Sequence, residues 1–275
     1  MKLVKILLLF IALATIGCAQ KENPSYAKDD LVLIPQPKSL KLNKGSFEIT
    51  KSTKIVIPQD SLASVSSILN DLFKKAAGFE LETSAEATSE NSIQLKINSE
   101  IAKEAYQLKV TSENVILEAN SKLGFVYGLE TIRQLLPKEI ESGSKVSNID
   151  WYIPNVEISD APQYSYRGNM LDVSRHFFGK DYIKKHIDRL AFLKLNTFHF
   201  HLVDDQGWRI EIKKYPKLTE VGGFRVDQED SHWNARTKND PDAEATFGGF
   251  YTQEDIKEIV AYAQEKGIRV IPEIE

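Results

Sequence analysis

The sequence has one cysteine, two methionines and no excess of basic residues among its 275 positions. A single cysteine cannot form an intrachain disulfide, which excludes a disulfide-stapled fold. With 35 basic and 39 acidic residues the formal net charge is −4, and a nucleic-acid partner is disfavoured because phosphate binding needs a concentrated basic face. The chain is 42% hydrophobic and 27% charged, which indicates an ordinary globular protein rather than a disordered or fibrous one.

The one long apolar run lies at the N-terminus. Lys2 and Lys5 precede residues 6–14, which are all apolar, and small residues follow up to Cys18. This pattern is typical of a secretory signal, and the run is too short to span a bilayer, which takes about 20 apolar residues. Residues 14–18, Ala-Thr-Ile-Gly-Cys, resemble a bacterial lipobox.

We therefore predict a lipoprotein signal peptide over residues 1–18, lipidation of Cys18, and a polar tether over residues 19–30. The mature protein would be exported and held in the bacterial cell envelope, in the periplasm or at the outer membrane. The lipid would be its only membrane contact. The alternative is plain export with an incidental cysteine.

Hydrophobic periodicity predicts two domains of the α/β class. Residues 31–150 mix alternating strand patterns with helical ones, which indicates an α+β domain. Residues 151–275 alternate strand, helix, strand, helix and strand, and this βαβαβ order implies parallel strands with crossover helices. Residues 204–251 exceed the length of a plain loop, so this segment carries function or contains small strands.

Polar residues follow each predicted strand of the second domain, and this placement favours a barrel over a doubly wound sheet. In a TIM (β/α)8 barrel the carboxyl ends of the strands form the active face. We therefore interpret residues 151–275 as the first part of such a barrel, which is incomplete with three strands.

The densest chemical signal is the run from His199 to Arg209. It places two imidazoles, two adjacent carboxylates and an indole at one strand end, and period-two alternation puts His199 and His201 on the same side. One interpretation is a metal-dependent hydrolase using these histidines. Another is a sugar site, since carboxylates and arginine bind hydroxyls and an indole stacks on a pyranose ring. The third is a polar barrel layer with satisfied histidines.

Longer motifs favour the sugar site. Residues 167–177, Arg-Gly-Asn-Met-Leu-Asp-Val-Ser-Arg-His-Phe, and residues 199–212, with the run His-Leu-Val-Asp-Asp-Gln-Gly-Trp-Arg, resemble the first two barrel strands of glycoside hydrolase family 20. Residues 213–222 continue the similarity. Residues 106–136 resemble the non-catalytic domain that precedes the barrel in that family.

The resemblance implies a β-N-acetylhexosaminidase that removes terminal β-linked N-acetylglucosamine or N-acetylgalactosamine. This family is an exception to the usual pair of catalytic carboxylates. The substrate's own acetamido oxygen attacks the anomeric carbon, and an oxazolinium intermediate leads to retention. The expected partners are glycans that contain N-acetylhexosamine, with no cofactor and no metal.

The resemblance also implies roles for five residues. Asp204 matches the acid that tunes the general acid through a downstream histidine. Arg167 matches the arginine that holds the ring hydroxyls of the terminal sugar, although a structural salt bridge is the alternative. Asp205 and His201 are expected to support substrate binding. Trp208 lines the pocket or packs under the segment that follows it.

Asp172, Arg175 and His199 are assigned instead to a structural network at the barrel mouth. The sequence departs from the family pattern, because it contains no Asp-Glu dipeptide and its third strand reads Pro272-Glu273-Ile274-Glu275, where the family has Pro-Glu-Ile-Asp and a later Pro-Gly-His. We therefore expect the 275-residue chain alone to be inactive. The alternative function is a surface lipoprotein that binds glycans without cleaving them.

Overall fold

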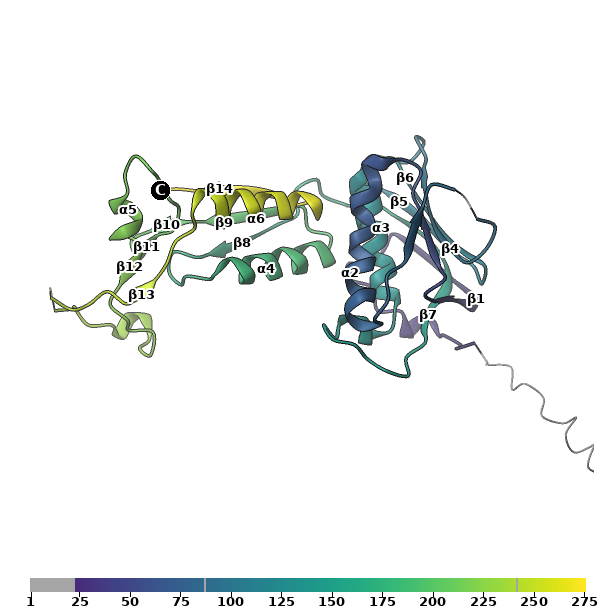
Figure 1. Cartoon of the computed structure of the whole chain (residues 1–275), viewed down its shortest axis with the longest axis horizontal. Helices are drawn as coiled ribbons and strands as arrows, with labels where there is room; N and C mark the ends of the chain where they lie inside the picture. The colour runs from purple at the N-terminus through teal and green to yellow at the C-terminus, as the bar shows by residue number, and fades with distance from the viewer. Residues whose placement is uncertain (1–22, 87, 241) are drawn as a thin grey trace, which may run out of the picture.

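The computed structural model describes residues 23–275 except 87 and 241, and it consists of two units joined by a short linker (Figure 1). The predicted signal peptide, Cys18 and the first part of the tether lie outside the described residues. Within the described ranges, no helix combines the length and apolar character needed to cross a bilayer.

A seven-stranded sheet with helices on one face forms the N-terminal unit, with strand order β1-β7-β5-β6-β4-β2-β3. Its elements are η1 (Lys28–Asp30), β1 (Ser39–Ile49), β2 (Lys54–Val56), η2 (Asp60–Ser66), α2 (Ser67–Ala76), β3 (Glu82–Ser84), β4 (Ser92–Ile97), β5 (Tyr106–Val110), β6 (Asn114–Ala119), α3 (Lys122–Leu135), η3 (Lys138–Glu141) and β7 (Trp151–Asp160). The α+β prediction for this unit is confirmed.

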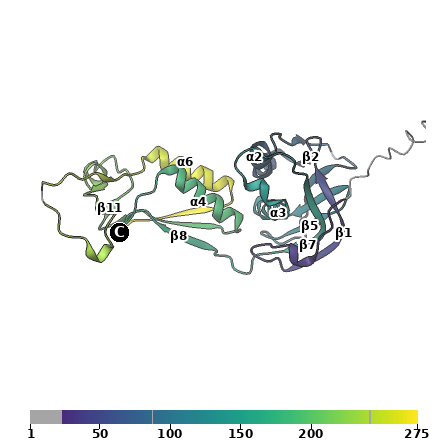
Figure 2. The same cartoon turned by 90° about the horizontal axis from the view of Figure 1, so that it is seen from below.

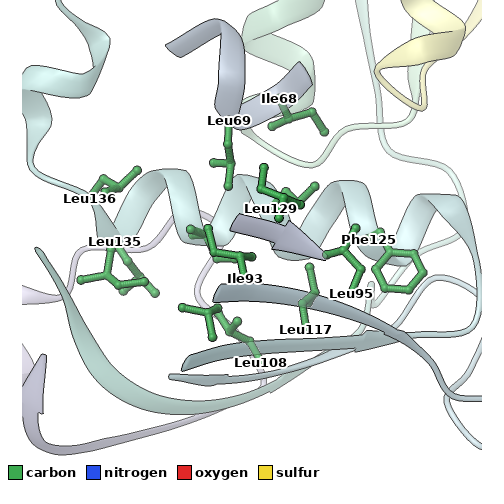
Figure 3. Packing of buried hydrophobic residues seen from close by; sticks show 14 of the residues in the cluster. Ile68, Leu69, Ile93, Leu95, Leu108, Leu117, Phe125, Leu129, Leu135 and Leu136 are labelled. Carbon is green, nitrogen blue, oxygen red and sulfur yellow. The ribbon is translucent and has the colours of Figure 1, made fainter. Parts of the chain in front are cut away.

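Helix α3 is buried on nearly all sides because it lies between the sheet and α2. Figure 3 shows Phe125 and Leu129 between α3 and the strands, with Leu69 of α2 on the other side of the helix. All three side chains are at most 1% exposed. Such sandwiching explains why the helix sequence is apolar around most of its circumference.

The predicted boundary after residue 150 is wrong, because strand β7 belongs to the N-terminal sheet. It pairs antiparallel with β1 and with β5, for example Val156 with Leu42 and Ile158 with Leu108. The first six residues of β7 are all buried. A strand buried on both faces loses its period-two pattern, so the sequence could not show which sheet it joins. The boundary lies after Asp160.

Three parallel strands, β8 (Gly168–Asp172), β9 (Thr197–His201) and β14 (Arg269–Glu273), form the sheet of the C-terminal unit, in the order β14-β9-β8. The crossover helices α4 (Lys180–Phe192) and α6 (Gln253–Glu265) lie side by side on one face of it (Figures 1 and 2). Ile183, Ile187 and Ile259 are fully buried beneath them. The predicted βαβαβ order is confirmed.

The long segment between β9 and α6 contains the small strands that its length predicted. The strands are β10 (Val203–Asp204), β11 (Gly207–Trp208), β12 (Phe224–Arg225) and β13 (Phe247–Gly248), and the segment also contains two short helices, α5 (Lys217–Glu220) and η4 (Trp233–Ala235). Both views place this segment at the end of the sheet farthest from the N-terminal unit (Figures 1 and 2). That end carries the carboxyl ends of β8, β9 and β14.

Candidate active site

Three ionisable side chains come from the same level of three adjacent strands. The parallel register aligns Asp172 of β8 with His201 of β9, and His201 with Glu273 of β14. Each is the last residue of its strand. The expectation that polar residues gather at the carboxyl ends is therefore confirmed, and this edge is where α/β barrels build their sites.

His199 and His201 share one acceptor, Oε2 of Glu273. The distance from Nε2 of His199 to this oxygen is 2.9 Å, and Nδ1 of His201 also contacts it. Both imidazoles therefore lie on the same side of β9, as period two predicts. The side chain of His201 is 6% exposed, so its ring is held in place by packing as well as by this bond.

Asp204 lies beside this group because a tight hairpin follows β9 at once. Val203 pairs with Trp208 and Asp204 with Gly207, which leaves a two-residue loop. Oδ2 of Asp204 contacts Nη2 of Arg175 and lies 3.1 Å from Nε2 of His201. The backbone N–H of Asp205, the His201 ring and the Arg175 guanidinium hold the pKa of Asp204 below its usual value. Asp204 is therefore an anion near neutral pH.

Arg175 joins the two aspartates of the cluster. Its Nη1 lies 3.1 Å from Oδ2 of Asp172 and 2.8 Å from Nε2 of His201. The other oxygen of Asp172 accepts hydrogen bonds from the backbone N–H groups of Ser174 and Arg175, which fixes the turn after β8. The side chain of Arg175 is 46% exposed, so part of its donor fork faces solvent.

The cluster contains three carboxylates and one guanidinium, so it has excess negative charge when the histidines are neutral. This excess acts on His201. Burial lowers the pKa of His201, but its hydrogen bonds to Glu273 and Asp204 outweigh that effect and raise the pKa above its usual value. The hydrogen bond from His201 in turn holds the pKa of Glu273 below normal.

Asp204, Asp205 and Trp208 line a shallow depression of about 380 Å³ beside this cluster. The carboxylate of Asp205 is exposed at its rim. The indole N–H of Trp208 donates to the carbonyl of Ile210 at 2.7 Å, and the ring packs partly against the core of the C-terminal unit. Trp208 therefore packs under the segment that follows it and also lines this depression, while its role in binding substrate stays a prediction.

Arg167 does not join this cluster, and the expected role of holding the ring hydroxyls beside Asp204 does not fit its position. It immediately precedes β8, whereas Asp204 follows β9, so parallel pairing places the two residues at opposite ends of the sheet. Nη2 of Arg167 lies 3.1 Å from Glu104 and 2.7 Å from the hydroxyl of Tyr127, both in the N-terminal unit. The position of Arg167 therefore agrees with the alternative, a structural salt bridge.

A second cation lies next to Arg167 at the junction of the units. Lys194 is buried, and its Nζ lies 3.0 Å from the hydroxyl of Tyr106 and 3.3 Å from Oδ2 of Asp160. Burial lowers the pKa of Lys194, although Asp160 acts against this. The cavity of about 280 Å³ between the units is lined by these groups. It lies at the amino ends of the strands, far from the acid pair.

A cation could be held by His201, Glu273 and Glu275, whose ligand atoms lie within 4.8 Å of one another. Both ring nitrogens of His201 are already engaged, however, Nδ1 by Glu273 and Nε2 by Asp204. The guanidinium of Arg175 also brings positive charge to 2.8 Å from Nε2. These contacts describe an ion-pair network, and the charge of Arg175 opposes a metal at this position.

Arg209 is a structural residue of the site that sequence reasoning missed. Its side chain is fully buried, and it donates to the carbonyls of five residues. These residues are Val173, Ser174, Gln206, Gly223 and Gly249. The guanidinium therefore ties the turn after β8 to the hairpin and to two later turns. Only the position of Arg209 at the end of the densest motif pointed to it.

Gly207 makes room for this buried guanidinium. A Cβ at position 207 would lie 2.2 Å from Cζ of Arg209. The Arg209 side chain is fully buried, so it cannot move into solvent to avoid this clash. The Gly-Trp-Arg run is thus explained by packing, because the hairpin can close over Arg209 only without a side chain at 207.

Taken together, an α/β unit that gathers carboxylates, a partly exposed arginine and an indole at its strand ends has the features of a carbohydrate-active site. Residues 164–275 match the family model described as Glycosyl hydrolase family 20, catalytic domain, and residues 30–161 match Glycosyl hydrolase family 20, domain 2. The gap between the two matches agrees with the boundary after Asp160. The chain belongs to glycosyl hydrolase family 20.

Known relatives agree with this assignment. The beta-hexosaminidase of Porphyromonas gingivalis is 39% identical over 270 residues, which covers 96% of this chain and 33% of the relative. The beta-hexosaminidase of Vibrio furnissii is 36% identical over 267 residues, covering 96% and 41%. The chain thus spans between about a third and two fifths of these relatives.

Solved structures show the same architecture. The Streptomyces plicatus N-acetyl-beta-hexosaminidase in complex with Thio-NAglucal superimposes with a TM-score of 0.78 at 35% identity, covering 92% of this chain and 47% of that one. The Vibrio harveyi exo beta-N-acetylglucosaminidase in complex with N-acetylglucosamine gives 0.76 at 33% identity, covering 94% and 38%. The described fold is accordingly an α+β domain followed by the first three strands of a (β/α)8 barrel.

Proposed function

We propose that this chain is the N-terminal part of an exo-acting β-N-acetylhexosaminidase. The observation that carries the proposal is the cluster of Arg175, His201 and Asp204 at the carboxyl ends of the barrel strands, in a chain of this family. The substrates would be glycans with a terminal β-linked N-acetylglucosamine or N-acetylgalactosamine. Hydrolysis would retain configuration through attack by the substrate's acetamido oxygen.

Within this proposal, Arg175 replaces Arg167 as the residue that holds the ring hydroxyls. Arg175 is at the correct end of the sheet, it is partly exposed, and its fork suits vicinal oxygens. Asp204 anchors that arginine and faces the same depression as Asp205 and Trp208. The acid that protonates the leaving oxygen is outside these residues, since the sequence has no Asp-Glu dipeptide.

The test uses the full-length gene product and a chromogenic aryl β-N-acetylglucosaminide. We expect turnover by the wild type, a loss of about 100-fold or more in kcat/KM for Arg175→Ala, and much less effect for Arg167→Met, because losing a charged contact made in the transition state costs about 2.7 kcal/mol or more. The 275-residue chain is a further control, for which the sequence predicts no turnover. Affinity for N-acetylglucosamine without turnover in the full-length protein would overturn the proposal and favour a glycan-binding lipoprotein.

We further propose that the protein is exported and lipid-anchored through Cys18. The support is the N-terminal pattern of two lysines, an apolar run and a small-residue exit before a cysteine. Metabolic labelling with a clickable fatty acid should label the wild type but not Cys18→Ser, and the labelled protein should sediment with membranes. Equal labelling of the two proteins, or no labelling of either, would contradict the anchor.

A further inference from the structure

Glu273 has no assigned role in the site, yet it is the acceptor on which the histidine geometry depends. One of its oxygens contacts Nδ1 of His201 and Nε2 of His199. The residue lies at the end of β14, so it reaches His201 from the neighbouring strand in register. Carboxylates in this position fix which nitrogen of an imidazole carries the proton.

The other nitrogen of His201 faces two competing partners. Oδ2 of Asp204 lies 3.1 Å from Nε2, and Nη1 of Arg175 lies 2.8 Å from the same atom. A protonated Nε2 donates to Asp204, whereas a bare Nε2 accepts from Arg175. One ring nitrogen cannot do both at once, so the protonation state of His201 selects its partner.

We propose that Glu273 is a positioning residue of the sugar site: its charge stabilises the imidazolium form of His201, in which Nδ1 donates to Glu273 and Nε2 donates to Asp204, and this leaves Arg175 free to pair with Asp204 and bind substrate. The predicted effect of Glu273 on enzyme activity rests on the proposed function. The effect on His201 itself is independent of any substrate.

The charged and titratable groups around His201 come from every element packed against it. They are Asp172 at the end of β8, Arg175 in the following turn, His199 on β9, Asp204 on β10, Glu273 on β14 and Glu275 beyond it. Four of these six are carboxylates, so the charge of the surroundings favours the imidazolium. Removal of the Glu273 charge takes away the carboxylate that contacts Nδ1 directly.

Glu273→Gln tests this with little change of shape. The amide can still accept from Nδ1, but it carries no charge and can equally present its NH2 group. His201 should then lose its proton at lower pH, and Nε2 should accept from Arg175 at neutral pH. Arg175 is drawn away from Asp204 in that state, which weakens sugar binding.

The first measurement follows His201 directly in the 275-residue chain. Long-range ¹H–¹⁵N NMR spectra report the tautomer and titration of each imidazole, and the sequence has five histidines. The His201 signal is assigned by its loss in His201→Asn. We expect the titration midpoint of His201 to move to lower pH in Glu273→Gln. Glu254→Gln, which changes an exposed glutamate of α6 paired with Lys257, should leave it unchanged.

The second measurement is the pH profile of kcat/KM in the full-length enzyme. We expect the fall at the alkaline side to begin at lower pH in Glu273→Gln, with a loss of about tenfold near pH 7.5, mostly in KM, and less than about twofold near pH 5, because tenfold corresponds to about 1.4 kcal/mol of lost contact. A merely structural residue would lower activity by a similar factor at every pH.

His199→Asn guards against a variant that simply misfolds. It removes the second donor to Glu273, so His201 keeps its charged partner and its midpoint should not move to lower pH. An unchanged His201 titration in folded Glu273→Gln would overturn the inference, as would a pH-independent loss of activity. A shifted titration in a full-length protein that cleaves no aryl N-acetylhexosaminide would support the inference and overturn the proposed function.

Discussion

Arg209→Met should destabilise the C-terminal unit by removing the anchor that joins its turns. The guanidinium is fully buried and contacts five backbone carbonyls rather than a carboxylate. Methionine has similar length and no polar atoms, so it fills much of the space but provides no donor. The carbonyls of Val173, Ser174 and Gly249 would then have no other donor among the hydrogen bonds of the described residues.

The expected magnitude follows from two opposing effects. Three carbonyls left without a partner, two of them buried and that of Gly249 partly buried, cost about 2 kcal/mol each, or about 6 kcal/mol. Against this, the variant no longer buries a charge. Burial, with a smaller effect from Arg225, lowers the pKa of Arg209 well below its usual value, to about 10. That depression corresponds to about 3 kcal/mol. The net loss of unfolding free energy is therefore about 3 kcal/mol.

Urea unfolding followed by tryptophan fluorescence measures the total change, and hydrogen exchange read by mass spectrometry locates it. Arg189→Met, an exposed arginine on α4, is the matched control and should change stability by less than about 0.5 kcal/mol. We expect faster exchange over residues 204–251 in Arg209→Met only. If unfolding and exchange in Arg209→Met matched the wild type, the carbonyls would not depend on this side chain and the reasoning would be refuted.

Three further changes test other parts of the fold. Arg167→Met removes the pair with Glu104 and should lower stability by about 2 kcal/mol without raising KM in the full-length protein, whereas a raised KM at unchanged stability would return Arg167 to the sugar site. Asp255→Asn removes a carboxyl whose pKa is held at about 2, first by Lys180; because this pKa is depressed, the stabilisation is present above pH 3.8 and is lost as pH falls towards 2. Urea unfolding should accordingly show a difference of about 1 kcal/mol from wild type at pH 5.5, after discounting for exposure, that shrinks at pH 2.5. Gly128→Ala would place a Cβ 2.2 Å from Cδ1 of Leu117, so thermal unfolding should show a loss of about 1–3 kcal/mol; wild-type stability would mean that Leu117 can move aside.

Local pattern was sufficient for the elements of secondary structure and for part of the site. Alternation placed His199 and His201 on one side of a strand, and the alternating segments of β5 and β6 pair with each other as an antiparallel hairpin. The capping pattern of Thr252 and Asp255 marks the start of α6, with both hydrogen bonds present. Each of these features depends on residues only a few positions apart.

The roles of Arg167 and Arg175 depend on which end of the parallel sheet each residue occupies. Arg167 stands before its strand and Arg175 after it, so they lie at opposite ends of the sheet. The motif alone does not distinguish them, because both are charged and both flank the same strand. The direction of β8 places Arg175 at the carboxyl ends of the strands, where the active face lies.

The sequence by itself determined the alternation of strands and helices, the family and the strand ends at which polar residues gather, because these follow from periodicity and from motifs contiguous in the chain. Only the tertiary structure decided that β7 completes the first sheet, that Glu273 meets His201 from another strand, and that Arg209 is enclosed by carbonyls of distant turns. Those contacts join residues far apart in the chain: 36 positions separate Arg209 from Val173, 72 separate His201 from Glu273, and 108 separate Ser46 from Pro154. Their partners are chosen by how whole elements pack, which no local pattern of side chains records.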